Sequence, residues 1–483
     1  MGHALTPRRQ APAWIAVLIA ASACARAAAP GAVRPAPGNA AAMARHLQSI
    51  RGDSTQLIAF LRDMPKGADL HNHLGGAVYA ESMIGWAGAD GLCLTLTTYT
   101  LTPPPCAAAA GRPPASLIAQ NTDLFGRVVD AWSMRHYDYS YGIGHDHFFA
   151  SFAKFGLAND RHLHDMLAEV TSRAAAEHLS YLELMQTLDG GVAARLGSRV
   201  GYVADFGAFR DRLLAAGLRD SLFGARDQFH FAEIRRRIIQ DCHGAHPDPG
   251  CQVTVRFLYQ VLRGLPPEVV FAQILTGFEL AHADSQVVGF NLVMPEDAAI
   301  PMRDFSLHMS MIDFLHRLYP DVRISLHAGE LVGSLVPAQG LTFHIRESIE
   351  KGHAERIGHG VDVLQERDAP GLLRMMASRG VLVEIALTSN DAILGIRGSQ
   401  HPLATYLRYG VPVALATDDE GVSRSDMTHE YLRAVTDQGI DYAALKAMAR
   451  NSIVHSFAEP PMKARLLREF DAAMVQFESR WSK

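Results

Sequence analysis

The stretch "RISLHAGE" (residues 323–330) decides how this chain folds. Its first four residues have strand-like chemistry, and the polarity then changes abruptly at His327 and Glu330. A single histidine and carboxylate at a strand end form a cap or a turn more often than a functional site. The interpretation therefore depends on whether other histidines and carboxylates stand at equivalent places along the chain.

Seven other segments repeat the same order of apolar strand, loop and amphipathic helix. Several of them are rich in Val, Ile and Leu without strict alternation, which is typical of parallel strands that are covered on both faces. Eight strands that alternate with helices favour an α/β fold of the (β/α)₈ TIM barrel type over two doubly wound sheets. The expected strands are residues 67–74, 181–187, 253–262, 287–293, 323–330, 356–362, 381–390 and 412–420.

Two connections in this series are long, at about residues 75–180 and 188–252, and we expect them to be insertions after the first and second strands. They contain all four cysteines outside the N-terminal leader, in two pairs with short separations. In an exported protein such close pairs favour disulfides that staple loops. The expected disulfides are Cys93–Cys106 and Cys242–Cys251.

The N-terminus has the pattern of a secretory signal peptide over residues 1–27. Two arginines precede the apolar run "AWIAVLIAASA", which is too short to span a bilayer comfortably. Small residues follow, with cleavage options near Ala23 or Ala27. The sequence therefore predicts an exported protein, periplasmic or secreted, and a lipoprotein anchored through Cys24 is the minority interpretation. A linker and one helix are expected over residues 28–63, and the barrel with its insertions over residues 64–483.

Composition excludes several classes of protein. The 483 residues are 48% hydrophobic and 20% charged, as in an ordinary globular protein. A net charge of -5 with mixed signs gives no basic surface for nucleic acid and no polybasic patch for a membrane. The H-x-E and P-C-x-x-C pattern of cytidine-type zinc deaminases is absent from the sequence. We expect a small-molecule partner, no nucleic acid and no stable membrane insertion once the leader is removed; a homodimer is left open.

Histidines and carboxylates recur at the ends of four expected strands. In a (β/α)₈ barrel the carboxyl ends of the strands converge at one face, where active sites are built. Three histidines and one carboxylate at that face would suit zinc and leave a position for water. The residues at these strand ends are His71, His73, His327, His359, Asp418 and Asp419.

Four motifs resemble the adenosine deaminase family, and more closely its secreted branch, the adenosine deaminase-like growth factors. They are "MPKGADLHNHL" (64–74), "SLHAGE" (325–330), "RIGHG" (356–360) and "ATDDE" (416–420). The similarity runs from about residue 64 to residue 457. It implies hydrolytic deamination of adenosine or a related 6-aminopurine to the 6-oxo product and ammonia, with one Zn²⁺ per chain.

The resemblance also implies a role for each residue that matches a family motif. His359 corresponds to the group that orients the attacking water. Glu330 corresponds to the proton donor to ring N1, so burial should raise its pKa. Gly329 would let the chain turn sharply and the substrate approach. The implied zinc ligands are His71, His73, His327 and Asp418, and the implied substrate contacts are Asp419 to ring N7, the backbone of Gly289 to ring N3, and pocket-lining Ser389, Phe152 and Phe155.

The sequence departs from the family pattern in three places. The usual "H-x-H-L-D-G" reads "HNHLGG" (71–76), so Gly75 replaces the aspartate that contacts the ribose 5′-hydroxyl. Adenosine, adenine and a modified 6-amino nucleoside therefore all stay open as substrates. Glu420 stands where proline is common, and "LTSN" (387–390) replaces a sequence with cysteine and proline.

Two alternatives of other kinds remain. One is an extracellular signalling or receptor-binding protein on a deaminase fold, which would not need every ligand together with Glu330 and His359. The other is a zinc hydrolase of the same superfamily that acts on an amide or ester, which is disfavoured because no lysine ends the fourth strand to bridge two metals.

Overall fold

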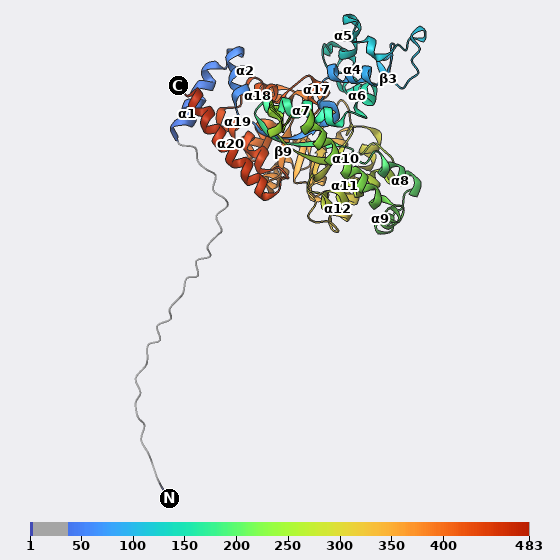
Figure 1. Ribbon diagram of the computed structural model, residues 1–483. Helices are drawn as coiled ribbons and strands as arrows, with labels where there is room; N and C mark the ends of the chain where they lie inside the picture. The colour runs from blue at the N-terminus through green and yellow to red at the C-terminus, as the bar shows by residue number, and fades with distance from the viewer. Residues whose placement is uncertain (3–36, 483) are drawn as a thin grey trace.

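The computed structural model describes residues 1–2 and 37–482 and has eight parallel strands at its centre (Figure 1). All eight expected strands are present, most of them shorter than expected. Their bounds are β1 (Gly67–His73), β4 (Leu179–Gln186), β5 (Thr254–Leu262), β6 (Val287–Val293), β7 (Ser325–Ala328), β8 (Arg356–His359), β9 (Leu382–Ile385) and β10 (Val413–Leu415).

The strands close into a barrel. Two parallel runs, β1-β4-β5-β6 and β7-β8-β9-β10, are joined by a bridge between Phe290 and Ile324 and by another between Asn72 and Asp418. At the second junction the amide of Asp418 donates to the carbonyl of His71 at 2.9 Å. The predicted (β/α)₈ architecture is confirmed, and its closure puts the ends of β1 and β10 side by side.

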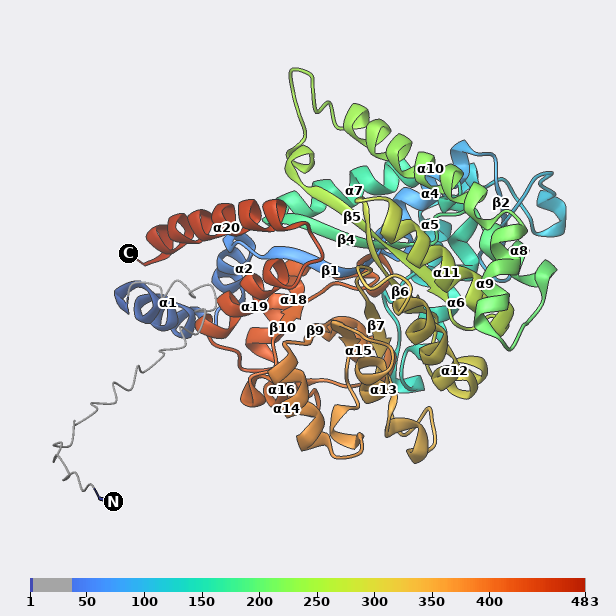
Figure 2. The same ribbon diagram turned by 90° about the horizontal axis from the view of Figure 1, so that it is seen from below.

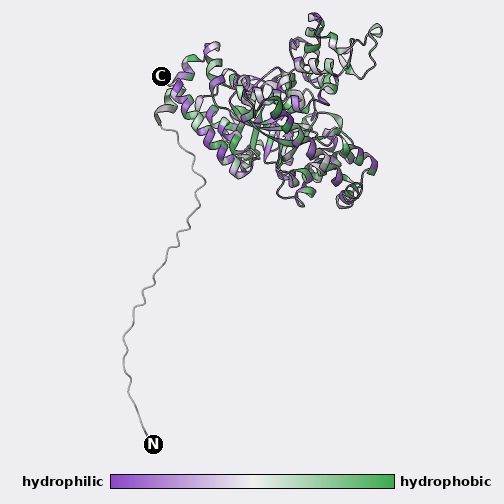
Figure 3. Ribbon diagram, viewed as in Figure 1, coloured by the Kyte–Doolittle hydropathy of each residue, from purple (hydrophilic) through white to green (hydrophobic). Residues whose placement is uncertain are grey.

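Helices surround the strands, as the view from below shows (Figure 2). Hydrophilic and hydrophobic residues alternate along these outer helices (Figure 3), because one face packs on the barrel and the other meets solvent. They are α7 (Leu163–Ala176), α11 (Pro267–Ala283), α12 (Ala299–His316), α13 (His344–Glu350), α14 (Ala369–Arg379), α15 (Leu387–Leu394), α16 (Leu403–Tyr409), α17 (Glu420–Ser423), α18 (Met427–Thr436) and α19 (Tyr442–Val454).

The first insertion projects from one side of the barrel (Figure 1) and includes an antiparallel hairpin that the sequence did not reveal. The predicted disulfide Cys93–Cys106 is present and joins the first strand of this hairpin to the loop after the second. The elements are α3 (Leu74–Ala77), α4 (Ala80–Ala89), β2 (Cys93–Thr95), β3 (Thr100–Thr102), α5 (Thr122–Ala131) and α6 (His145–Asn159).

The second insertion is helical and carries the other predicted disulfide, Cys242–Cys251, which is also present. Its helices are α8 (Val192–Val200), α9 (Phe206–Ala215) and α10 (Leu218–Ile239). Helices α8 and α9 pack on α11, α10 packs on α7 and α11, and a loop after α10 leads into β5.

The segment before the barrel forms two helices, α1 (Pro37–Ile50) and α2 (Ser54–Asp63), and not the single helix that was expected. The chain turns at Asp53, whose side chain accepts hydrogen bonds from the amides of Thr55 and Gln56 and so caps a new helix. Both helices lie beside the C-terminal helix α20 (Pro460–Trp481) (Figure 1).

The predicted leader, its cleavage sites and Cys24 fall within residues 3–36, outside the described residues. Within residues 37–482, no helix has both the length and the apolar character needed to cross a membrane.

Candidate active site

The histidines and aspartates at the strand ends meet at one end of the barrel. They form two groups, and within each group the possible ligand atoms, one from each residue, all lie within 4.8 Å of one another. Asp418 belongs to both, so the two groups form one cluster. The first group is His71, His327, His359 and Asp418, and the second is His73, Asp418 and Asp419.

The four predicted ligands present their lone pairs to one another. The Nε2 atoms of His73 and His327 are 3.2 Å apart, and Oδ1 of Asp418 lies 3.3 Å from Nε2 of His73. Nε2 of His71 is buried and has no hydrogen-bond partner among the described residues. Nitrogens and a carboxylate oxygen that converge in this way suit a tetrahedral metal such as zinc.

The electrostatic field at the cluster also favours a cation. Although burial opposes it, contacts with Asp418 and Glu384 raise the pKa of His71 to about 10. In the same site, burial and the neighbouring His71 lower the pKa of His327 well below its usual value. The carboxylates of Asp418 and Glu384 thus stabilise positive charge at His71, and a metal ion bound at its Nε2 would take the place of the proton there.

A second hydrogen bond orients each of the three histidines on the predicted ligand list. Nδ1 of His71 contacts Glu384 at 2.7 Å, Nδ1 of His73 contacts Gln260 at 3.1 Å, and Nδ1 of His327 contacts Asn291 at 2.8 Å. These bonds fix the rings and leave Nε2 as the free donor atom, an arrangement common around bound metals. None of the three partners was identified from the sequence, since each lies within a strand far from its histidine.

Glu330 and His359 face each other at the edge of the cluster, with 3.7 Å between Oε1 and Nε2. Oε1 of Glu330 is buried and has no hydrogen-bond partner among the described residues. Burial, and then the negative charges of Asp418 and Glu296, raise the pKa of Glu330 well above its usual value. Glu330 is therefore poised to carry a proton near neutral pH.

His359 is held in one neutral tautomer. Burial lowers its pKa to about 3. The amide nitrogen of Asn390 lies 2.9 Å from Nδ1, and the other end of that amide accepts from His401 at 3.1 Å. Because an amide N–H donates to Nδ1, the ring proton resides on Nε2, which faces Glu330.

The turn that carries Glu330 is fixed from behind by Glu296. The carboxylate of Glu296 accepts the amides of Gly329 at 3.2 Å and Glu330 at 2.9 Å, and it also contacts His344 at 2.6 Å. Gly329 has φ +76°, as the expected sharp turn requires. A Cβ at Gly329 would meet Asp362 behind the site, so the second expected reason, room for the substrate, is wrong.

A cavity of about 480 Å³ opens beside the cluster. Asp419 borders it with a buried Oδ1 that has no hydrogen-bond partner among the described residues, and burial, with the charge of Asp418, raises the pKa of Asp419 well above its usual value. Gly76 lies against Asp419, where a Cβ would meet the carboxylate, and the cavity is also lined by Gly75 and by phenylalanines of α6. The phenylalanines are Phe148, Phe149 and Phe152.

Three of the predicted pocket residues do not border this cavity, and those predictions are corrected. Phe155 is buried in the core against Trp132. The hydroxyl of Ser389 donates to a carbonyl within its own helix. Gly289 lies in the first half of β6, where a Cβ would meet a neighbouring carbonyl. Phe152 does border the cavity.

Met294, which the sequence did not single out, borders the cavity just after the end of β6. Its φ is +82°, and His359 and Asp418 also have positive φ, at +68° and +57°. Residues other than glycine rarely adopt a positive φ, and backbone strain of this kind is concentrated at functional sites. The backbone thus marks the same end of the barrel as the chemistry does.

The two other departures from the family motifs have local explanations. Residues 387–390, expected at the end of a strand, begin helix α15, and this turn delivers Asn390 to His359. Glu420 is buried and accepts a hydrogen bond from Arg173 at 2.8 Å. A charged residue replaces proline here because it has a buried cation to pair with.

The model of the adenosine deaminase family matches residues 218–473, slightly more than half of the chain. The chain belongs to the adenosine deaminase family. The nearer resemblance to its secreted growth-factor branch stays a prediction.

Curated relatives within the family are named for several substrates. They include an aminodeoxyfutalosine deaminase of Streptomyces coelicolor, 35% identical over 30% of this chain and 35% of that protein. An adenosine deaminase of Serratia proteamaculans is 35% identical over 30% of this chain and 41% of that protein. An adenine deaminase of Sinorhizobium medicae is 28% identical over 44% of this chain and 60% of that protein. The chain thus spans between about a third and three fifths of the length of these relatives.

Several solved structures share the fold of this chain. An adenine deaminase from Arthrobacter aurescens superposes with a TM-score of 0.53 at 18% identity, covering 84% of this chain and 98% of that one. The N6-methyl-AMP deaminase from Arabidopsis thaliana superposes with a TM-score of 0.54 at 20% identity, covering 87% and 99%. At these identities the likeness shows that the overall fold is shared.

Proposed function

We propose that this protein is an exported, zinc-dependent enzyme that hydrolyses the 6-amino group of adenosine or a related 6-aminopurine to the 6-oxo product and ammonia. The observation that carries the proposal is the buried, unpartnered carboxyl oxygen of Glu330, which faces His359 beside the histidine–aspartate cluster. This set of groups favours an enzyme over a signalling protein, since binding to a receptor would not require a buried protonated carboxyl group.

The metal would be held by His71, His73, His327 and Asp418, whose donor atoms converge. Zinc bound in such a site lowers the pKa of a coordinated water towards ~7. Export is proposed from the leader of residues 1–27, and the two disulfides fit an oxidising compartment.

Three side chains of the protein would carry out the remaining steps of the reaction. Glu330 donates its proton to ring N1, which makes C6 electrophilic, and Nε2–H of His359 orients the water that adds to C6. Asp419, with its raised pKa, donates a hydrogen bond to ring N7. The water's oxygen bonds to C6, one of its two protons passes to the amino nitrogen and the other returns to Glu330, whose first proton stays on N1. The bond between C6 and the amino nitrogen then breaks, ammonia leaves, and the 6-oxo purine remains.

The substrate's sugar is the least determined part. No carboxylate stands at Gly75, and the cavity lining includes the aromatic rings of Phe148, Phe149 and Phe152. Adenine, adenosine and a nucleoside with an apolar 5′ substituent all remain candidates, in line with the different names that relatives carry.

Ammonia release by the zinc-loaded protein tests the proposal. The panel is adenine, adenosine, 2′-deoxyadenosine, AMP and aminodeoxyfutalosine. We expect turnover of at least one of them, and a loss of ~10²–10⁴-fold in kcat for Glu330→Gln with zinc content unchanged. The matched control is Glu469→Gln, at an exposed position on α20. Wild-type turnover by Glu330→Gln, or no deamination of any aminopurine, would contradict the proposal.

A further inference from the structure

Helix α10 exposes an apolar stripe on its outer face. Phe231, Ile234 and Ile238 are 61%, 58% and 62% exposed. Their spacing of three and four residues places them on one side of the helix. Large hydrophobic side chains are usually buried, and a contiguous exposed patch of a few hundred Å² marks an interaction site.

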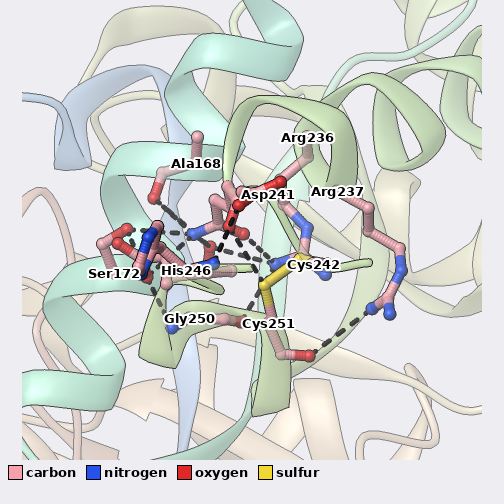
Figure 4. The surroundings of a disulfide bond; sticks show 12 residues. Ala168, Ser172, Arg236, Arg237, Asp241, Cys242, His246, Gly250 and Cys251 are labelled. Carbon is pink, nitrogen blue, oxygen red and sulfur yellow. Dashed lines mark hydrogen bonds between the residues drawn. A yellow bond between two sulfur atoms is a disulfide. The ribbon is translucent and has the colours of Figure 1, made fainter. Parts of the chain in front are cut away.

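The other face of α10 is firmly attached to the barrel, so the stripe has a fixed orientation. The ring of Phe229 stacks on Phe257 of β5, with 4.4 Å between centroids. Buried Arg236 donates to the side chain of Gln240 at 2.6 Å and to the carbonyl of Gly250 at 3.0 Å (Figure 4).

The disulfide Cys242–Cys251 closes the loop that follows α10 around this network (Figure 4). The C-terminal end of the helix is thereby tied to the start of β5 and cannot roll its apolar side inwards. The exposed stripe is consequently a lasting feature of the folded chain and not a frayed helix end.

The charges and sizes of the residues along the stripe are complementary to those of the same stripe on a second copy of the chain. When two α10 helices are paired antiparallel about Phe231, Asp227 lies opposite Arg235 of the other copy, and Gly224 lies opposite Ile238. Neither the side chain of Asp227 nor that of Arg235 forms an ion pair or hydrogen bond with another described residue. A two-fold axis repeats every contact, so the two copies of Phe231 meet at the centre and one charge pair lies on each side of them.

We propose that the outer face of α10 is a self-association surface through which two copies of this chain pair antiparallel about Phe231. Specific interfaces bury on the order of 1,000 Å² or more over the two partners, so the contact must include the charged flanks of α10 as well as its apolar side chains. A membrane surface fits less well, because Asp227 lies within the stripe and anionic headgroups would repel it. The pairing does not depend on the deaminase proposal.

Sedimentation velocity of the mature chain, from ~1 to ~100 μM, tests the surface. We expect a concentration-dependent dimer whose dissociation constant rises at least ~10-fold in Ile238→Lys. The matched control is Val475→Lys on α20, where Val475 is 64% exposed, and it should leave the dimer intact. A wild-type chain that stays monomeric throughout, or a dimer that Ile238→Lys leaves intact, would overturn the proposal.

A charge exchange tests the antiparallel pairing itself. Asp227→Arg and Arg235→Asp should each weaken the homodimer, because like charges then face one another. An equimolar mixture of the two variants should recover the dimer, since both opposing pairs become attractive. Absence of recovery would refute the pairing about Phe231, and binding to anionic vesicles that Ile238→Lys abolishes would assign the surface to a membrane instead.

Discussion

The two walls of the cavity differ in origin and in the way they are held. On the barrel side, the ligating histidines and His359 are each fixed by a second polar group, as His71 is by Glu384, and Glu296 holds the backbone at Glu330. A second part of the lining consists of phenylalanine rings from α6, which belongs to the first insertion. The barrel wall is thus ordered by directional bonds, and the insertion wall by packing.

This difference assigns chemistry and substrate choice to separate parts of the chain. A hydrogen-bonded donor set tolerates little displacement, because the geometry of a metal site and of proton transfer is strict. An apolar wall can change in size without disturbing those groups, and insertions beyond the strands are where such folds vary. We therefore expect substitutions on the barrel wall to affect turnover and metal, and those on the α6 wall to affect binding.

The largest effect should come from Asp418→Asn. The amide removes the only negative charge among the predicted ligands, so zinc should be lost and kcat should fall at least ~10⁴-fold. Zinc content by mass spectrometry and kcat together measure this. Asp123→Asn, at an exposed position on α5, is the control. Retention of zinc by the Asp418 variant would remove that residue from the ligand set.

A smaller loss of zinc affinity is expected when the substituted residue only orients a metal-ligating histidine. Asn291→Ala leaves Nδ1 of His327 without its acceptor, and zinc affinity should drop ~10–100-fold. Competition with a chelator measures the affinity. Asn291→Asp keeps an acceptor at that position and should restore most of it. Equal losses in both variants would point to a general packing defect and not to ring orientation.

The pH profile should show a basic limb set by Glu330. Burial and the charge of Asp418 raise its pKa, and the protonated form is the one that donates. Activity is then present below this raised pKa and is lost as pH rises through it, by about tenfold per pH unit beyond it. The dependence of kcat on pH measures this. A limb near pH ~4.3 instead would mean that Glu330 titrates as an ordinary glutamate.

The smallest effect is expected on the aromatic wall. Phe152→Ala should raise KM by up to about tenfold with little change in kcat, because it removes apolar contact that substrate and transition state share. Phe155→Ala is the matched variant: Phe155 lies in the core and not on the cavity, so unfolding temperature should fall while KM stays the same. A larger KM effect in Phe155→Ala would reverse this assignment.

The sequence was sufficient for the features that depend on local pattern. Runs of apolar residues predicted all eight barrel strands, and the alternation of side chains along β1 put His71 and His73 on the same side. Close cysteine pairs predicted both disulfides. The break between α1 and α2 was missed, since the cap at Asp53 interrupts an otherwise continuous helical pattern. The start of α15 was missed as well, because it has no side-chain cap and its apolar residues continue the pattern of β9.

The sequence by itself determined the eight strands, their order along the chain and the polar residues at their ends. These features follow from the pattern of apolar residues, which marks where each strand begins and ends. Only the tertiary structure decided which groups hold those residues. Glu384, Asn291 and Gln260 meet their histidines because the strands are arranged in a barrel, which brings residues that are 313, 36 and 187 positions apart within 3.1 Å. Contacts of that kind depend on strand register and tilt, which no local pattern encodes.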